Sequence, residues 1–432
     1  MGENGENGDS ALFLEEKIGR CPHFPHFPPF SHFPCPHFPH LKETKSMIEW
    51  NRLILDTPST SEMLRYGGTR TWQERRPIVV WNTTFRCNLN CLHCYAQSQN
   101  KSYLGELTTQ EAKAMISDLS DFNIPVLLFS GGEPLMRNDI FELADFAVKS
   151  GLKIALSTNG TLITEKIASK IKEAGFTYIG ISLDGIGETN DKFRGQKGAF
   201  DLALNGIHHC QQTGIKTGIR FTINKYNYHE LSAILGLVKE KNIERCCIYH
   251  LVYAGRGSHL IDKDISRKES MQASEVIFNW VMGNGSKYPE ILTVDNHADG
   301  VFLYLRLKQT DPEKAEQVFN LLATNGGNSS GIGIGCIDNL GEVHADQFWQ
   351  HYSFGNVRQQ RFSDIWMDVS NELMRGLKER KGLLKGRCSQ CKYLTLCNGN
   401  MRSRAEAVYG DVWASDPACY LTDEEIGVTL QP

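Results

Sequence analysis

Short apolar segments alternate with amphipathic segments between about residues 77 and 251. Six apolar segments, several of them rich in β-branched residues, are predicted as strands: 77–85, 125–130, 153–158, 178–183, 216–223 and 245–251. The segments between them repeat apolar residues at helical spacing, and several begin at Thr, Asn or Asp and end near Gly, as helices do. Strands that are apolar throughout and separated by helices indicate a parallel sheet covered on both faces. Six such units predict an α/β fold, either a partial barrel or an open sheet, with reactive groups at the carboxyl ends of the strands.

The pattern changes on both sides of this region. Residues 1–45 contain a proline every few positions between Cys21 and His40, which forbids regular structure and predicts a disordered tail rich in His, Phe and Pro. Haem or metal binding by its histidines is the alternative interpretation. We predict a lead-in at 46–76, the barrel at 77–255, a connecting and substrate-pocket region at 256–335 with one clear helix at 314–325, and a Cys-rich C-terminal domain at 336–432.

The composition narrows the class of protein. The chain has 432 residues, 41% of them hydrophobic and 22% charged, which is typical of globular proteins. A net charge of −4 disfavours a nucleic-acid partner, which needs a basic excess. We expect no membrane span, because no apolar run reaches the roughly 18 residues of a membrane helix. With no signal peptide, the expected location is the cytoplasm, where thirteen cysteines are better explained as metal ligands or reactive thiols than as disulfides.

Three cysteines follow the first predicted strand in the pattern C-x3-C-x2-C: Cys87, Cys91 and Cys94. Three thiolates on one tight loop suit an iron–sulfur cube, in which each iron takes one cysteine. A fourth cysteine is absent nearby, so one iron would stay open for a substrate or cofactor. A structural zinc site is the alternative, but its fourth ligand would have to be His93, which has poor reach between two ligands.

This loop resembles the signature of the radical S-adenosylmethionine (SAM) superfamily, and motifs at the ends of the next three strands strengthen the resemblance: SGGEP at 130–134, STNG at 157–160 and SLDG at 182–185. The resemblance implies a partial (β/α)6 barrel and a SAM site. It implies that the cluster donates an electron to bound SAM, which then cleaves into methionine and a 5′-deoxyadenosyl radical. This radical removes a hydrogen atom from the substrate. The residues that match the SAM-binding motifs are Tyr95, Gly131, Gly132, Glu133, Pro134, Ser157, Asn159, Ser182, Asp184 and Arg194.

A second set of cysteines stands near the C-terminus in the pattern C-x2-C-x5-C-x21-C: Cys388, Cys391, Cys397 and Cys419. Four thiolates complete a tetrahedral set, so both zinc and a 4Fe–4S cluster fit by count. Resemblance to radical SAM enzymes with a SPASM or twitch extension implies an auxiliary 4Fe–4S cluster, and therefore two 4Fe–4S clusters in all. We predict that Cys210, Cys246 and Cys247 are core residues, and that Cys336 is a buried thiol or an extra ligand.

Several segments narrow the resemblance to the tetrapyrrole-modifying group of this superfamily: 253–257, 293–300, 325–349, 354–366 and 387–421. Similarity to its deacetylases implies removal of two acetate side chains from 12,18-didecarboxysiroheme, giving Fe-coproporphyrin III. The alternatives are the haem d1 branch, which acts on propionates, haem synthase, and a peptide-modifying SPASM enzyme. Peptide modifiers carry a leader-binding domain, for which 46–76 is too short. A zinc-stabilised binding module without activity is the alternative outside enzymes. The implied electron donor is a ferredoxin or flavodoxin.

A flat iron-bearing polycarboxylate needs apolar faces and guanidinium groups in its pocket. Arg220, on the fifth predicted strand, and Arg256, beyond the sixth, are candidate carboxylate clamps. Four residues in Gly-rich segments are candidate iron ligands or proton donors: His297, Asp299, His344 and Asp346. The two histidines are the candidate catalytic residues. Turn or capping roles are the alternative for each.

Overall fold

The computed structural model describes residues 47–57, 65–66, 71–286 and 288–429. All of them belong to the compact unit Leu41–Pro432. The predicted tail, with Cys21 and Cys35, lies outside the described residues.

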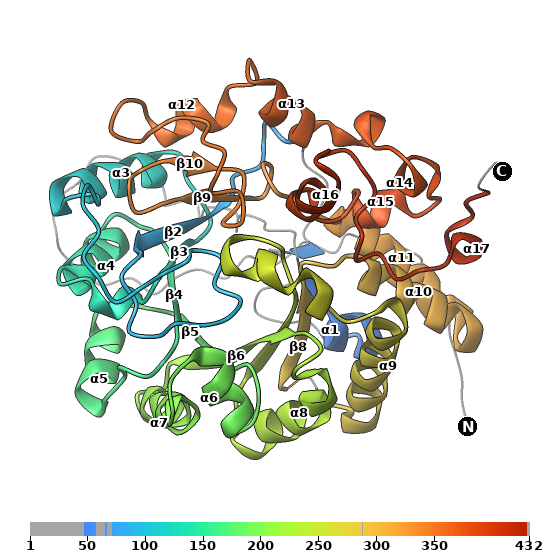
Figure 1. Ribbon diagram of the computed structural model, residues 1–432, viewed down its shortest axis with the longest axis horizontal. Helices are drawn as coiled ribbons and strands as arrows, with labels where there is room; N and C mark the ends of the chain where they lie inside the picture. Colours follow the sequence, from blue (N-terminus) through green and yellow to red (C-terminus); the bar gives the residue numbers. More distant parts are fainter. Residues whose placement is uncertain (1–46, 58–64, 67–70, 287, 430–432) are drawn as a thin grey trace, which may run out of the picture. The chain divides into compact units, whose positions relative to one another are not determined.

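The described strands form one sheet in the order β1-β8-β7-β6-β5-β4-β3-β2-β9-β10 (Figure 1). The strands are β1 (Met47–Glu49), β2 (Ile78–Thr84), β3 (Leu127–Gly131), β4 (Ile154–Thr158), β5 (Tyr178–Ser182), β6 (Lys216–Ile223), β7 (Arg245–His250), β8 (Glu290–Val294), β9 (Ile334–Ile337) and β10 (Val343–His344). The strands β2 to β7 pair in parallel in chain order. They coincide with the six predicted strands, so the predicted α/β fold with a partial barrel is confirmed.

The sheet is longer than predicted. Strand β8 adds in parallel to β7, and β9 adds in parallel to β2. Antiparallel β1 and β10 occupy the two edges. The sequence pattern missed β8 and β9 because they stand in the less regular connecting region and in a Gly-rich segment. The predicted domain boundary after residue 335 falls inside β9, and the domain limits stay predictions.

Helices follow most of the parallel strands, and Figure 1 shows α3, α4, α5, α7 and α8 around the outer side of the curved sheet. Threonine side chains define two helix starts: Thr108 forms a capping box with Glu111, and Thr164 caps α5. The described helices are α1 (Trp50–Leu55), α3 (Thr109–Asp121), η1 (Pro134–Met136), α4 (Ile140–Lys149), α5 (Glu165–Glu173), α6 (Glu188–Arg194), α7 (Ala199–Gln212), η2 (Tyr228–Glu230), α8 (Leu231–Glu240), η3 (Gly255–Lys263), α9 (Arg267–Asn284), α10 (Ala298–Thr310), α11 (Pro312–Asn325), α12 (Phe362–Met367), α13 (Glu372–Lys378), η4 (Arg380–Leu383), α14 (Arg387–Gln390), α15 (Leu394–Cys397), α16 (Arg402–Tyr409) and α17 (Asp423–Ile426).

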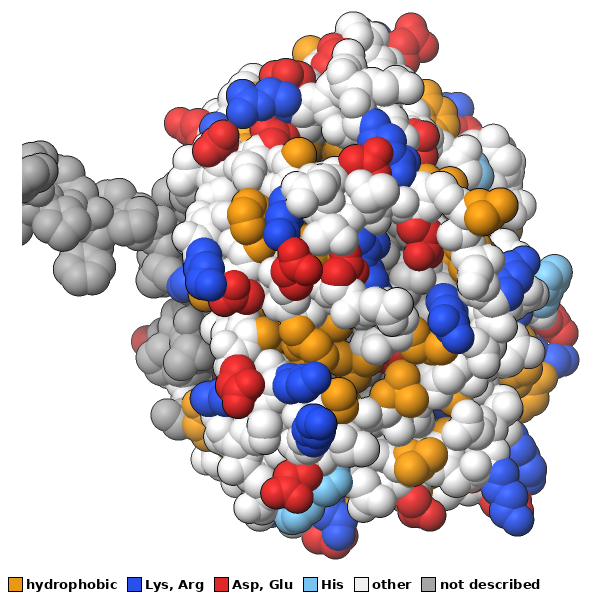
Figure 2. All heavy atoms as spheres, turned by 90° about the vertical axis from the view of Figure 1, so that its left-hand side faces the viewer, with side chains coloured by type: hydrophobic (Ala, Val, Ile, Leu, Met, Phe, Trp, Pro, Cys, Tyr) orange, Lys and Arg blue, Asp and Glu red, His pale blue; other side chains and the backbone are white. Residues whose placement is uncertain are grey.

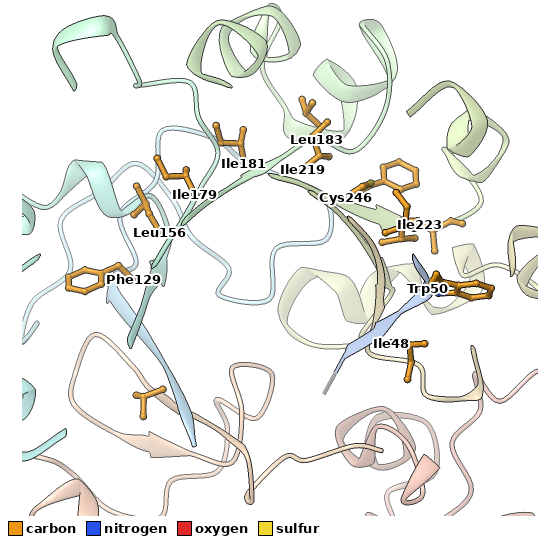
Figure 3. Packing of buried hydrophobic residues seen from close by; sticks show 14 of the residues in the cluster. Ile48, Trp50, Phe129, Leu156, Ile179, Ile181, Leu183, Ile219, Ile223 and Cys246 are labelled. Carbon is orange, nitrogen blue, oxygen red and sulfur yellow. The ribbon is translucent and has the colours of Figure 1, made fainter. Parts of the chain in front are cut away.

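The main core lies between the sheet and these helices. Figure 3 shows Phe129, Leu156, Ile179 and Ile219 pointing away from the hollow side of the sheet, and all four are fully buried. Burial of such side chains contributes about 1.5–3 kcal/mol each to folding. The hollow side is thereby left to polar residues at the strand ends.

The predicted core cysteines Cys210, Cys246 and Cys247 are buried, and so is Cys336, whose sulfur accepts a hydrogen bond from Asn82 Nδ2 at 3.5 Å. None of the eleven described cysteines forms a disulfide.

Charges of both signs are interspersed over the face on the left of Figure 1, which Figure 2 shows from the front.

None of the described helices combines the length and the apolar character needed to cross a membrane.

Candidate active site

The loop that carries Cys87, Cys91 and Cys94 follows β2 and is held at several points. The backbone N–H groups of Asn90 and Leu92 donate to the last two carbonyls of α6, at 3.3 and 3.0 Å. Arg256 donates from Nε to the Cys91 carbonyl at 2.8 Å and from Nη1 to the Ser98 carbonyl at 3.0 Å. These bonds fix the three sulfurs on one side of a cavity, the active-site cavity.

The thiols of this loop are largely removed from water. Burial raises the pKa of Cys87 to about 12 and also raises the pKa of Cys91. The guanidinium of Arg194 donates to the Cys91 sulfur at 3.6 Å and opposes that rise. Because metal ligation requires thiolates, a cationic centre would have to replace the protons on these sulfurs.

A glycine pair lets the end of β3 pass close to the cysteine loop. A side chain at Gly131 would lie 2.4 Å from the Thr84 carbonyl oxygen, and one at Gly132 would lie 2.4 Å from the Arg86 carbonyl oxygen. The backbone N–H of Gly132 donates to the Thr84 carbonyl at 2.7 Å. The glycines are therefore required by backbone packing beside the cavity.

The facing wall of the active-site cavity comes from β6, β7 and the end of β8. It contributes Arg220, Tyr249, His250 and Asp295. The guanidinium of Arg220 lies 4.7 Å from the centre of the Tyr249 ring. Burial raises the pKa of Asp295 to about 7, although Arg404 lowers it.

The second cysteine set surrounds a separate cavity, the auxiliary cavity, between α14, α15 and the segment before α17. Asn400 and Asp416 line it beside the four sulfurs. Burial raises the pKa of Cys419 to about 11. In the described part of the chain, no group of three or more His, Cys, Asp or Glu side chains is arranged to hold a metal ion. Sulfurs spread around a cavity suit a cluster whose irons each take one cysteine.

Two family models match the chain, that of the radical SAM superfamily at residues 81–238 and that of an iron–sulfur cluster-binding domain, SPASM, at residues 329–392. Fe-coproporphyrin III synthase from Methanosarcina barkeri is 56% identical over 88% of this chain and 99% of that protein. Pre-heme d1 synthase from Dinoroseobacter shibae is 42% identical over 82% and 88%. AdoMet-dependent heme synthase from M. barkeri is 34% identical over 79% and 95%. The chain belongs to the radical SAM superfamily.

Solved structures agree on the fold of this radical SAM enzyme. The structure of anSMEcpe with bound AdoMet and Cp18Cys peptide matches with a TM-score of 0.61 and 19% identity, over 79% of this chain and 94% of that one. Streptococcus suis SuiB bound to S-adenosylmethionine matches with a TM-score of 0.63 and 17% identity, over 80% and 78%.

The cofactors of the enzyme are SAM and two 4Fe–4S clusters. The described residues fit them, because two sets of buried sulfurs line separate cavities and the first cavity also has polar strand ends. Cys87, Cys91 and Cys94 would hold one cluster, and the four C-terminal cysteines the other. Together the first cluster and SAM supply the radical that removes a hydrogen atom.

Most residues predicted to bind SAM lie where the sequence placed them. The active-site cavity is lined by Tyr95, Gly131, Gly132, Ser157, Asn159, Ser182 and Arg194. The Tyr95 hydroxyl donates to Asn82 Oδ1 at 2.9 Å, which fixes its ring. Their contacts with SAM stay predictions.

Three of the predicted residues do not line this cavity, namely Glu133, Pro134 and Asp184. Asp184 is fully buried, pairs with Arg194 at 2.5 Å and accepts the Thr222 N–H at 2.9 Å. It therefore orients Arg194, which does reach the cavity.

Glu133 is fully buried and accepts from three donors: Leu135 N at 3.1 Å, Thr158 Oγ1 at 2.8 Å and Asn159 N at 2.8 Å. Burial raises the pKa of its carboxyl group. In this arrangement Glu133 positions the end of β4, and its predicted contact with the SAM amino group stays a prediction.

We expect Glu133→Gln to weaken SAM binding about tenfold. The NH2 group of the new side chain would face an N–H or O–H that now donates to the carboxylate, and the bond that holds Asn159 would be lost. Equilibrium binding of SAM to the reconstituted protein measures this effect. Glu142→Gln, which changes a half-exposed pair with Lys113 on the surface, serves as the matched control. Equal SAM affinity in both variants would show that the Glu133 carboxylate does not position the site.

The four candidate iron ligands or proton donors lie outside the active-site cavity. His297 is buried beside Asn400, and burial lowers its pKa to about 4, so it is neutral. His344 Nδ1 lies 2.8 Å from the Tyr352 carbonyl oxygen. Asp299 contacts His250 Nε2 at 2.9 Å, and Asp346 accepts the Phe348 N–H at 2.8 Å. These two aspartates thus orient residues that line the cavity, while the predicted roles of all four stay predictions.

Arg256 lines the active-site cavity, but two of its nitrogens bond the cysteine loop. Its part as a carboxylate clamp stays a prediction.

Sequence reasoning missed Tyr249, His250 and Asp295. Tyr249 and His250 end a predicted strand, a position that could have identified them, whereas Asp295 could not be placed without β8.

Proposed function

We propose that this enzyme removes the two acetate side chains of 12,18-didecarboxysiroheme and thereby makes Fe-coproporphyrin III. The similarity to Fe-coproporphyrin III synthase over nearly the whole length of that protein supports this product. The haem d1 reaction is the second candidate, with lower identity. The similarity to the solved structures shows the fold alone and does not favour peptide modification, because these structures are below 20% identical to this chain.

The structural observation that carries the proposal is the environment of Arg220. Its guanidinium packs on the Tyr249 ring and has neither an ion pair nor a hydrogen bond to the other described residues. Arg220 is partly buried. A charge that is partly removed from water without a partner is costly, and a carboxylate that forms two bonds with the guanidinium offsets that cost. An acetate side chain entering the active-site cavity supplies such a group next to the predicted SAM site.

Asp295 contributes a carboxyl group to this wall of the active-site cavity. Its pKa of about 7 leaves it partly protonated at neutral pH. It therefore neutralises Arg220 only in part. An anionic group of the substrate can therefore bind beside Arg220. When Asp295 is protonated, its O–H can donate a hydrogen bond to a carboxylate oxygen of that group.

Anaerobic incubation of the reconstituted enzyme with SAM, a reductant and 12,18-didecarboxysiroheme tests the reaction. We expect a product mass lower by two acetate groups. Altered propionates would favour the haem d1 branch or haem synthase instead. The proposal includes a ferredoxin or flavodoxin as electron donor and a cytoplasmic location.

We expect Arg220→Met to lower kcat/KM for the tetrapyrrole at least tenfold, since a hydrogen bond to a charged group contributes about 1.5–3 kcal/mol. Arg220→Lys should recover only part of this loss, because an amine cannot form the paired contact. SAM cleavage without tetrapyrrole should stay as in the wild type. An unchanged kcat/KM in Arg220→Met would remove Arg220 from the substrate site.

A further inference from the structure

A second hollow adjoins the active-site cavity, with a volume of about 440 Å3, in the range of small-molecule sites. We call it the aromatic groove, and its defining residues are Phe85, Tyr95, Tyr253, Phe348, Trp349 and His351. These residues follow β2, the cysteine loop, β7 and β10, and helix α16 closes the groove with Ser403 and Glu406. Apart from Tyr95, none of these residues belongs to the motifs predicted to bind SAM.

Two residues join the groove to the active-site cavity. Tyr95 and Phe348 line both hollows, and their rings meet edge to face with centroids 5.6 Å apart. A ligand in the groove therefore contacts two rings that also line the cavity in which hydrogen abstraction is predicted. Aromatic walls on several sides suit a flat macrocycle.

The groove also has buried donors that lack acceptors. Trp349 is 1% exposed and Ser403 is 7% exposed, and neither Trp349 Nε1 nor Ser403 Oγ has a hydrogen-bond partner among the described residues. A buried donor left unpaired costs about 1–3 kcal/mol, so these two groups point to a ligand that accepts hydrogen bonds. Carboxylates at the edge of a macrocycle are such acceptors.

His351 is the histidine of the groove that can bind iron. Its side chain is 62% exposed, and its Nε2 lies 3.2 Å from Glu406 Oε2. Histidines that bind metals characteristically place the second ring nitrogen against a carboxylate, which orients the ring. Here Nδ1 has no hydrogen bond to a described residue and is available for coordination.

We propose that the aromatic groove binds the iron tetrapyrrole, with His351 as an axial ligand of its iron and with Trp349 and Ser403 as donors to its carboxylates. This inference rests on the proposed tetrapyrrole substrate and adds the site at which the macrocycle docks. His351 replaces His297 and His344, which lie outside both the groove and the active-site cavity, as the histidine that contacts iron.

Spectroscopic titration of the full-length reconstituted protein tests the axial ligand. The probes are ferric Fe-coproporphyrin III and metal-free coproporphyrin III, followed by absorption, electron paramagnetic resonance and fluorescence. The iron form bound to wild type should show a shifted Soret band and the signals of histidine-ligated ferric iron. His351→Ala should lose these signals and bind the iron form at least tenfold more weakly, yet bind the metal-free form as wild type does. Glu406→Gln should weaken binding of the iron form about tenfold.

His208→Ala provides the matched control, since His208 is an exposed histidine on α7. It should leave every signal unchanged. Trp349→Phe and Ser403→Ala should each weaken both forms of the probe about tenfold. A wild-type spectrum in His351→Ala would show that His351 is not the axial ligand. Wild-type affinity of both Trp349→Phe and Ser403→Ala for the metal-free form would show that the macrocycle does not bind in the groove.

The binding experiments on the groove and the assay of acetate release test separate claims. Acetate release by wild type with unchanged binding in all groove variants would reject the groove alone. Binding that depends on His351, without acetate release in the mass assay, would reject the proposed reaction and keep the groove.

Discussion

Replacing Cys91 by alanine is expected to abolish SAM cleavage and to lower the iron content from about eight to about four atoms per chain. The reason is geometric: the active-site cavity is lined by three cysteines, so the loss of one leaves no spare cysteine among the residues that line it. Cys87→Ala and Cys94→Ala should behave alike. Iron analysis after anaerobic reconstitution, with chromatography of the SAM cleavage products, measures both effects.

Cys210→Ala is the matched control, because Cys210 is a fully buried thiol of α7 that lines neither cysteine cavity. It should keep the full iron content and full SAM cleavage. Retention of SAM cleavage in Cys91→Ala would overturn the assignment of the loop as the cluster site.

Replacing Arg404 by methionine is expected to lower the free energy of unfolding by about 3–5 kcal/mol, the usual effect of leaving one member of a buried ion pair behind. Arg404 and Asp416 are both fully buried and lie 2.8 Å apart. The same guanidinium donates to the Leu251 carbonyl at 2.9 Å and to the Asp295 carbonyl at 2.7 Å. It therefore ties α16, beside the auxiliary cavity, to the ends of β7 and β8. Urea unfolding at equal cluster content measures the change.

Lys385→Met gives the comparison for this prediction. Its pair with Asp411 is also short, at 2.7 Å, but the lysine side chain is 63% exposed. Water screens such a pair, so the expected effect is below about 1 kcal/mol. Equal losses in the two variants would mean that Arg404 contributes no more than a surface charge does.

Elements that depend on neighbouring residues could be derived from the sequence. The alternation of apolar and amphipathic segments gave the strands β2 to β7, because residues within one strand or helix share a periodic environment. Cysteine spacing and the glycine pair identified the first cluster loop and the end of β3 for a similar reason, since both are constraints within a few residues.

The tertiary structure decided what depends on residues far apart in the chain. Strand β9 pairs with β2 across more than 250 residues of sequence, and no local pattern records that pairing. The same holds for the isolation of Arg220 on the Tyr249 face, for the bonds from Arg256 to the cysteine loop, and for the meeting of Tyr95 with Phe348. A side chain's chemistry depends on its burial and partners, and only the packed chain supplies these.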